Sequence, residues 1–281
     1  MKWSSNKSWL LFLPAVLFLI LPLYGLAAAI SQSFQQQGEW TLSAYQQLFQ
    51  SDRFLSAVGF SLEVAFLSSL LSLLIGLLFT RSFYPYLASH TPRLIVWMPM
   101  LFPHFVWGYM VILLLSETGV LAQVFTLLGG DDFPTLTQDS RGIGIILTYV
   151  WKEVPFVILM LLPVYATIKP EYYDLVKTLG GGAWSQFKQV EWPHLLPVMI
   201  ETFLIVFAFT ISAYEVPALL GTTFPEMLSV LSYNWFYGSS WDDRSLAFAA
   251  MVLLSLFILI LTFIGYIYMN KKRFRMMKGK S

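Results

Sequence analysis

Five ionisable side chains interrupt long apolar stretches of the 281-residue chain: Glu63, Lys152, Glu153, Glu201 and Glu215. A charge within such a stretch is costly in a membrane, so it usually faces a cavity or a partner group. Glu201 lies near one end of its stretch, where it can reach the interface. The other four are three carboxylates and one lysine. If these four side chains line one cavity, the excess of negative charge makes that cavity favourable for a cationic solute. They therefore form our candidate substrate pathway.

These charges have a second, purely structural interpretation. Lys152 can pair with Glu63 or Glu215 and hold neighbouring helices together. Adjacent helical residues also point about 100° apart. We therefore expect that Lys152 and Glu153 do not both face the same narrow path.

The three histidines show no sign of a metal site. His104 follows Pro103 inside an apolar stretch, and we interpret it as a hydrogen-bonded buried histidine rather than a ligand. His90 and His194 belong to connecting loops and form no metal-ligand spacing with it. Because cysteine is absent, thiolate ligands and a cysteine nucleophile are excluded. We predict no catalytic residue and no metal ligand in this chain.

Composition indicates the environment of these side chains. The chain is 57% hydrophobic and only 12% charged, whereas soluble domains carry about 25% charged residues. The net charge of +1 excludes a strongly basic nucleic-acid-binding protein. We therefore predict an integral membrane protein without a soluble catalytic domain.

Six apolar runs are each long enough to cross about 30 Å of hydrocarbon as a helix: 9–30, 54–80, 94–116, 143–168, 198–220 and 246–269. The runs are continuous, whereas barrel strands alternate apolar and polar residues. The sequence thus predicts an all-α, polytopic fold, with residues 1–281 forming a single transmembrane domain. The first run also resembles a signal peptide, but it exceeds the usual apolar length of about 7–15 residues, which favours a retained anchor.

The distribution of Lys and Arg predicts the orientation. With the N-terminus in the cytoplasm, the outer side carries Arg53, Arg141 and Arg244, and the inner side carries Lys2, Lys7, Arg81, Arg93, Lys169, Lys177, Lys188, Lys271, Lys272, Arg273, Arg275, Lys278 and Lys280. Both termini are therefore expected in the cytoplasm. The basic C-terminal tail is most simply a flank beside anionic lipid.

The inner loop over residues 169–197 carries the clearest local pattern. Pro170 suits the first turn of a helix, which we expect to continue to Leu179. The three glycines 180–182 then permit a sharp turn. A second short helix over 183–190 would place Ala183, Phe187 and Val190 on one face, before Pro193 and Pro197 redirect the chain into the next span. We expect this helix–turn–helix to present an exposed apolar and carboxylate face.

This loop resembles that of a known family, the transmembrane permease subunits of type I binding-protein-dependent ABC importers. The family's loop reads Glu-Ala-Ala, three residues, Gly, nine residues, Ile, one residue, Leu-Pro. This chain keeps the spacing with Asp174-Leu175-Val176, Gly180, Val190 and Trp192-Pro193. Phe187 also lies where the family often has phenylalanine. The departures are Asp for Glu, Leu-Val for Ala-Ala, Val for Ile and Trp for Leu.

Two further segments resemble a subgroup of that family. Trp40-Thr41-Leu42 with Tyr45, and the segment from Ala213 to Gly221, are similar to permeases for polyamines, ferric iron, thiamine or phosphonates. The resemblance therefore implies a small cationic or metal-bearing solute, or a phosphonate.

The resemblance also implies the partners. The family's permeases have no ATPase of their own, so ATP and Mg would be bound by a dimer of a separate cytoplasmic ATPase. The residues implied to couple to it are Asp174, Leu175, Val176, Gly180, Phe187, Val190 and Pro193. A second permease subunit, identical or related, and an extracytoplasmic substrate-binding protein would complete the complex in the bacterial inner membrane. Asp174 could instead be an ordinary solvated charge.

Two other function classes remain open from the sequence. A membrane-embedded enzyme would need a nucleophile or metal constellation at one depth, and the chain offers scattered carboxylates. An ion-coupled secondary transporter could use those carboxylates, but it would leave the glycine-containing loop unexplained. Co-purification of an ATPase would separate the importer from both.

Overall fold

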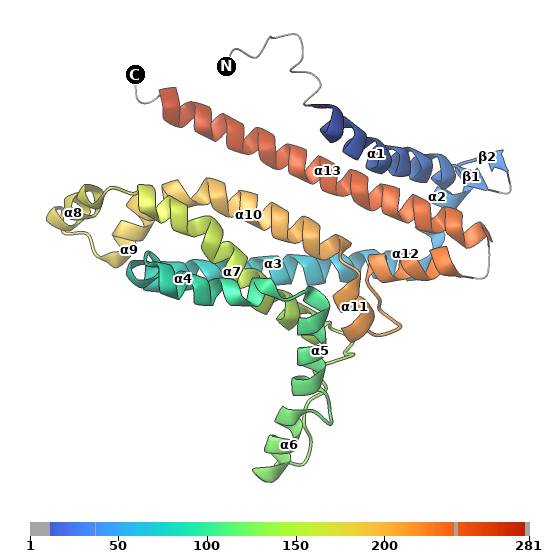
Figure 1. Ribbon diagram of the computed structural model, residues 1–281, viewed down its shortest axis with the longest axis horizontal. Helices are drawn as coiled ribbons and strands as arrows, with labels where there is room; N and C mark the ends of the chain where they lie inside the picture. The colour runs from blue at the N-terminus through green and yellow to red at the C-terminus, as the bar shows by residue number, and fades with distance from the viewer. Residues whose placement is uncertain (1–11, 37, 239–240, 279–281) are drawn as a thin grey trace. The chain divides into compact units, whose positions relative to one another are not determined.

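The computed structural model describes residues 12–36, 38–238 and 241–278, whose regular secondary structure is helical apart from one short hairpin (Figure 1). The described residues form two compact units. One holds the residues up to Leu55 together with Leu231–Leu256, and the other holds Ser56–Val230 and the residues from Phe257. Because each of α3 (Asp52–Leu87), α12 (Leu228–Tyr237) and α13 (Trp241–Lys278) contributes residues to both units, the single transmembrane domain stays a prediction.

Six helical segments of the described chain are long and apolar enough to cross a membrane, as the sequence predicts. They are Leu13–Ser33, Asp52–Leu87, His104–Leu127, Ile143–Thr167, Ala183–Ser212 and Asp243–Met269. The all-α fold class is thereby confirmed. The orientation of the termini stays a prediction.

The first unit contains α1 (Leu13–Ser33), a hairpin of β1 (Gln35–Gln36) and β2 (Glu39–Trp40), and α2 (Ser43–Gln50). The strands are antiparallel, with Gln35 opposite Trp40. Ser33 at the end of α1 shares a 2.7 Å hydrogen bond with the Tyr45 hydroxyl on α2, which joins the two helices. The apolar side chains of α1 are largely exposed, as expected of a helix that contacts lipid or another subunit.

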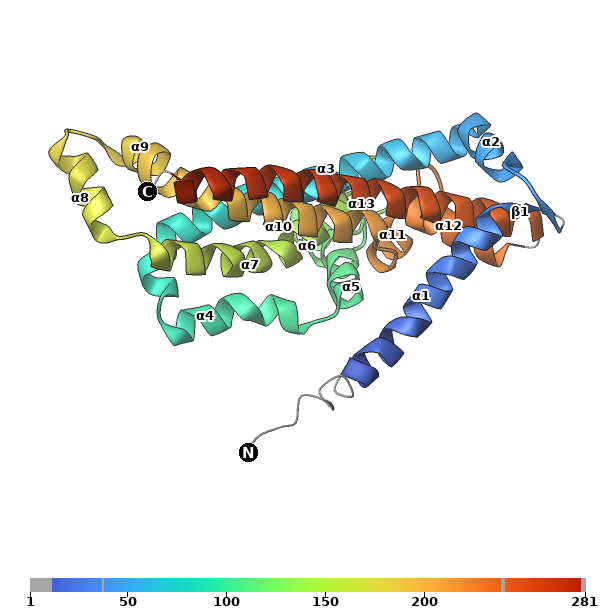
Figure 2. The same cartoon turned by 90° about the horizontal axis from the view of Figure 1, so that it is seen from above.

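The second unit is built on α3, α7 (Ile143–Thr167) and α10 (Trp192–Ser212); Figures 1 and 2 show α7 and α10 side by side. Gly76 allows α3 and α7 to approach closely, because an added Cβ would lie 2.5 Å from Val157 Cγ1. Close contact at small residues is a common way to pack membrane helices. Val157, Leu161 and Leu195 are fully buried in the resulting core.

The third expected span, 94–116, is wrong as a single helix. The structure divides this region into α4 (His90–Trp97), the 3-10 turn η2 (Met98–Leu101) and α5 (His104–Leu115), and α4 and α5 run in different directions (Figure 1). Phe102 and Pro103 are extended between them. Pro99 and Pro103 cause the break, because neither can donate a helical backbone hydrogen bond.

The fifth expected span, 198–220, is also corrected. α9 (Ala183–Gln186) continues through a π-helical turn, η3 (Phe187–Glu191), into α10, which runs past Pro197 to Ser212. The expected redirection at Pro193 and Pro197 is therefore wrong. The wider π turn accommodates the missing N–H of Pro193. Extended backbone at Ala213 then ends α10, and α11 (Glu215–Leu220) is a separate helix.

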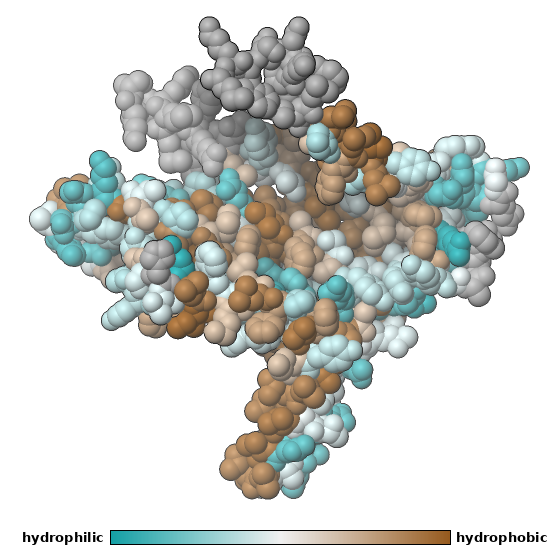
Figure 3. All heavy atoms as spheres, in the orientation of Figure 1, coloured by the Kyte–Doolittle hydropathy of each residue, from teal (hydrophilic) through white to brown (hydrophobic). Residues whose placement is uncertain are grey.

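After α5, the chain forms α6 (Val120–Leu127), whose apolar side chains are strongly exposed. Leu127 is 86% exposed and Leu128 83%. Figure 3 shows this segment as a brown, hydrophobic surface at the bottom of the view. Such a surface is typical of a protein in contact with lipid or another subunit.

Candidate functional site

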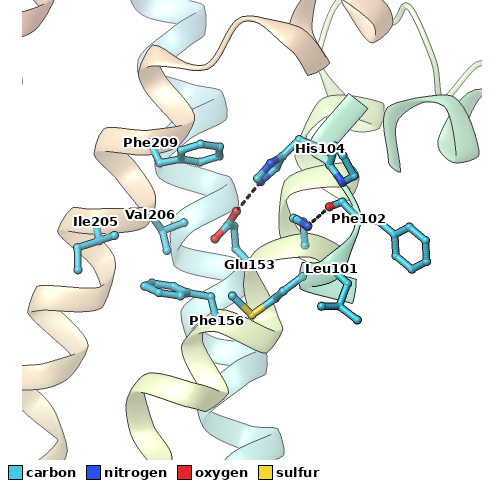
Figure 4. A pocket seen from close by; sticks show the side chains of 11 residues that line it. Leu101, Phe102, His104, Glu153, Phe156, Ile205, Val206 and Phe209 are labelled. Carbon is cyan, nitrogen blue, oxygen red and sulfur yellow. Dashed lines mark hydrogen bonds and ion pairs between the residues drawn. The ribbon is translucent and has the colours of Figure 1, made fainter. Parts of the chain in front are cut away.

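The break between α4 and α5 places His104 opposite α7. His104 is the first residue of α5, and its Nε2 lies 3.2 Å from Oε1 of Glu153 in the middle of α7 (Figure 4). Glu153 is 8% exposed. A buried carboxylate needs such a partner because the charged form is poorly solvated there. The expected hydrogen bond of His104 is confirmed, but its expected burial is not, since the His104 side chain is 26% exposed.

Lys152, the neighbour of Glu153, uses its charge differently. Its Nζ donates hydrogen bonds to the backbone carbonyls of Pro99, at 2.8 Å, and of Phe102. Both carbonyls belong to the broken segment, where regular helical donors are missing. The expected pairing of Lys152 with Glu63 or Glu215 is therefore wrong. Lys152 instead holds the segment between α4 and α5 against α7 through these two hydrogen bonds.

A cavity of about 490 Å³ lies beside these groups, and we call it the Glu153 cavity. Figure 4 shows side chains from α10, α7 and the η2 segment around it; its lining includes Met100, His104, Lys152, Glu153, Phe156 and Phe209. Lys152 and Glu153 thus border the same cavity, which our expectation from helix geometry excluded. Both can do so because the ammonium of Lys152 is turned to backbone oxygens.

A second cavity of about 420 Å³ shares His104 and Phe209 with the first, and we call it the Glu215 cavity. Tyr149, Tyr214 and Glu215 also line it. Glu215 is exposed, at the start of α11. Tyr149 is fully buried, and its hydroxyl has no hydrogen-bond partner among the described residues. Sequence reasoning did not identify Tyr149, Tyr214 or Phe209, because aromatic residues are common in every span.

The structure separates Glu63 from this group. Glu63 lies on an exposed part of α3 and lines neither cavity. The candidate pathway residues Lys152, Glu153 and Glu215 therefore come together around His104, and Glu63 does not join them. An exposed carboxylate within an apolar helix still requires a polar neighbour outside this chain or an aqueous path.

The loop after α7 has the expected helix–turn–helix form at the end of that helix (Figure 2). α8 covers Pro170–Thr178, and Gly180 has a φ of +77°, a conformation that L side chains rarely adopt. Gly181 is also constrained, since an added Cβ would lie 2.5 Å from Val176 Cγ1. The glycine turn and the first short helix are thus confirmed. The second, expected over 183–190, is α-helical only to Gln186 and then continues through the π turn into α10.

Burial within this loop differs from the expected exposed face. Val176 is 7% exposed and Val190 is 4%, and both pack into the core with Phe187 beside them. The apolar face is instead formed by Leu175, Leu179 and Trp184, which are 59%, 78% and 72% exposed. Asp174 is exposed as well, with Lys177 Nζ at 3.8 Å. The predicted coupling residues therefore form two groups. Val176, Phe187 and Val190 pack in the core, whereas Asp174 and Leu175 are exposed.

Arg81 near the end of α3 holds the second half of this loop. Its Nε lies 3.1 Å from Glu191 Oε2, its Nη2 donates to the Ala183 carbonyl at 2.9 Å, and its guanidinium lies 4.9 Å from the centre of the Phe187 ring. The Tyr165 hydroxyl of α7 donates to Glu191 at 2.9 Å. Sequence reasoning assigned Arg81 only to the set of inner positive charges.

Membrane-length helices, cavities with charged linings and an anchored helix–turn–helix define a multi-pass membrane transport protein. Residues 69–275 match the family described as the binding-protein-dependent transport system inner membrane component. The chain belongs to this family, and the predicted resemblance to type I ABC importer permeases is confirmed.

Individual relatives are more distant. The chain is 27% identical over 184 residues to the putative ferric transport system permease protein FbpB 1 of Haemophilus influenzae, covering 66% of this chain and 28% of that protein. It is 26% identical over 236 residues to the inner membrane ABC transporter permease protein YnjC of Escherichia coli, covering 81% and 43%. The chain thus spans less than half the length of these two relatives.

A solved structure shows the same fold. A chain of a bacterial ABC transporter involved in the import of the acidic polysaccharide alginate superposes with a TM-score of 0.73 at 20% identity, covering 95% of this chain and 96% of that chain. The similarity supports the arrangement of helices described above.

Proposed function

We propose that this protein is the membrane-spanning permease subunit of an ATP-driven, binding-protein-dependent importer. It would form half of the translocation pathway, beside a second permease subunit, in the bacterial inner membrane with both termini in the cytoplasm. The observation that carries the proposal is the helix–turn–helix between α7 and α10, whose outer face is exposed while its inner face is fixed in the core.

The loop can transmit force because its two faces have different roles. The outer face of Asp174, Leu175, Leu179 and Trp184 would contact a separate ATPase, which binds ATP and Mg. The inner face of Val176, Phe187 and Val190 packs with α7 and α10. Closure of the ATPase dimer would then move these helices as a body, and no covalent chemistry in this chain is needed. Gly180, with its positive φ, sets the turn of the chain between the two faces.

The solute that best fits the intramembrane charges is small and cationic or metal-bearing, such as a polyamine, thiamine or ferric iron. Glu153 and Glu215 support this choice, since both carboxylates border cavities. A phosphonate is the anionic alternative from the sequence resemblance. An extracytoplasmic binding protein would deliver the solute.

The coupling role is tested at the outer face. Leu179→Ser and Asp174→Lys should each reduce co-purification of the ATPase and uptake in vesicles, because they remove apolar contact area and reverse a charge at an interface. Leu179→Met and Asp174→Glu are the matched controls, since they keep the apolar surface and the charge at the same exposed positions. Full ATPase association and normal uptake in both loop variants would remove the importer assignment.

A further inference from the structure

We propose that the Glu215 cavity binds an organic cation of single positive charge, with the charge delocalised over a ring or shielded by alkyl groups. The inference rests on the proposed function for the role of the cavity in uptake, and it narrows the class of solute. Four observations carry it: the charge balance of the lining, its aromatic content, an unpaired buried hydroxyl and the spacing of potential metal ligands.

The charge balance of the cavity leaves one carboxylate for a ligand. Among the lining residues, Glu215 is the carboxylate and His104 is the other group that ionises near neutral pH. His104 is engaged with Glu153, and Lys152 is turned to the backbone carbonyls of the broken helix. Because His104 is paired with Glu153, the negative charge left in the lining is that of Glu215, which a single cation would balance.

Aromatic rings dominate the rest of the lining. The ring centres of His104 and Phe209 are 4.7 Å apart, and Tyr149 lies 6.4 Å from His104 and 6.3 Å from Phe209. Tyr214 borders the same cavity. Aromatic faces attract weakly hydrated cations such as quaternary ammonium groups, most strongly where water is excluded. A carboxylate beside several rings is therefore suited to an organic cation.

The Tyr149 hydroxyl supplies an independent sign of a ligand. It is buried and makes no hydrogen bond to any described residue. Leaving a buried hydroxyl unsatisfied costs about 1–3 kcal/mol, so buried polar groups almost always have a partner. An acceptor on a solute in the adjoining cavity would satisfy it.

The same residues are poorly suited to a bare metal ion. Among the described residues, no group of three or more His, Asp or Glu side chains is close enough to hold a metal. Hard metal ions take several oxygen or nitrogen ligands at short distance. The cavity of about 420 Å³ also lies within the range of volumes that hold small organic molecules.

The test measures binding to the full-length chain in lipid nanodiscs without the ATPase. The probes are choline and its uncharged isostere 3,3-dimethylbutan-1-ol. Isothermal titration calorimetry measures the affinity of the chain for each probe. We expect choline to bind at least about tenfold more tightly than the isostere, because only choline gains from the carboxylate and the rings.

Glu215→Gln and Phe209→Leu should each weaken choline binding about tenfold. Tyr149→Phe should weaken the binding of betaine methyl ester, a cation whose carbonyl can accept a hydrogen bond from the Tyr149 hydroxyl. It should not weaken the binding of tetramethylammonium, which has no acceptor.

Glu39→Gln is the matched control, since Glu39 is an exposed carboxylate on β2 outside the cavity. Thermal unfolding of each variant verifies that the protein remains folded. Equal binding of choline and its isostere, or choline affinity unchanged by both Glu215→Gln and Phe209→Leu, would overturn the proposal. Because no ATPase is present, such a result leaves the coupling role untouched, and loss of coupling in the loop variants leaves the binding result untouched.

Discussion

The guanidinium of Arg81 lies 3.1 Å from the carboxylate of Glu191, although 110 residues separate them in the chain. Tyr165 donates to the same carboxylate from α7 at 2.9 Å. Burial, followed by the nearby Glu191 charge, raises the pKa of Tyr173 on α8 to about 12. One carboxylate thus joins α3, α7 and the start of α10.

The first prediction concerns the stability of this junction. Arg81→Met leaves Glu191, which is 5% exposed, without its charge partner. Breaking a fully buried pair typically costs about 3–5 kcal/mol, and we expect a smaller loss here because the Arg81 side chain is 32% exposed. We expect a clearly lower thermal unfolding midpoint in detergent. Adding Glu191→Leu should restore part of the loss, because it removes the buried charge.

Arg93→Met is the control for this prediction. Arg93 also donates to backbone carbonyls, those of Leu87 and Ala88, but among the described residues it forms no ion pair with a buried carboxylate. Its loss should lower the midpoint much less. Equal effects of Arg81→Met and Arg93→Met would show that the Arg81–Glu191 pair does not stabilise the junction.

The second prediction concerns the turn at Gly180. Its φ of +77° penalises a side chain by about 1–2 kcal/mol, and a β-branched residue most. Gly180→Val should still insert in the membrane but reduce binding-protein-stimulated ATP hydrolysis and uptake. Gly180→Asn should retain most activity, because asparagine tolerates this conformation. Gly182→Ala is the control, as Gly182 has a φ of −84° and open space around its Cα; Gly180→Val activity equal to this control would contradict the prediction.

Local patterns were sufficient for much of the fold. Apolar runs of membrane length identify the six spans, and Pro170 with the glycines identifies α8 and the turn at Gly180. These features depend on hydrophobicity and backbone freedom, which act over a few residues. The break at Pro103 was missed because a proline inside an apolar run can either kink a helix or end it. The break at Ala213 carries no proline or glycine in the sequence that would indicate it.

Contacts between distant residues could not be predicted in the same way. The Arg81–Glu191 pair and the bonds from Lys152 to the η2 segment depend on how α3, α4 and α7 pack. Val176 and Val190 were predicted as residues that couple to the ATPase, yet the structure buries them. Spacing along the loop identifies which residues share a face, but only packing determines which face is covered.

The third prediction concerns orientation, which follows from the distribution of basic residues. The chain contains no cysteine, so single cysteines can be introduced without background labelling. Cysteines at Asp132 and Ser140 should react with an impermeant thiol reagent from outside intact cells, and those at Ser89 and Thr178 should react only after permeabilisation. All four positions are exposed, so a reversed pattern would place the α8 loop outside and exclude its contact with a cytoplasmic ATPase.

The last prediction concerns the lysine that holds the broken helix. Lys152→Met removes the donor to the Pro99 and Phe102 carbonyls, and a hydrogen bond to a charged group is worth about 1.5–3 kcal/mol. Because Lys152 is 6% exposed, water cannot easily replace it. We expect a lower unfolding midpoint and faster proteolysis between α4 and α5, with normal membrane insertion. Lys188→Met changes an exposed lysine and should have little effect. If both variants unfolded at the wild-type temperature, the break would be held by the prolines alone.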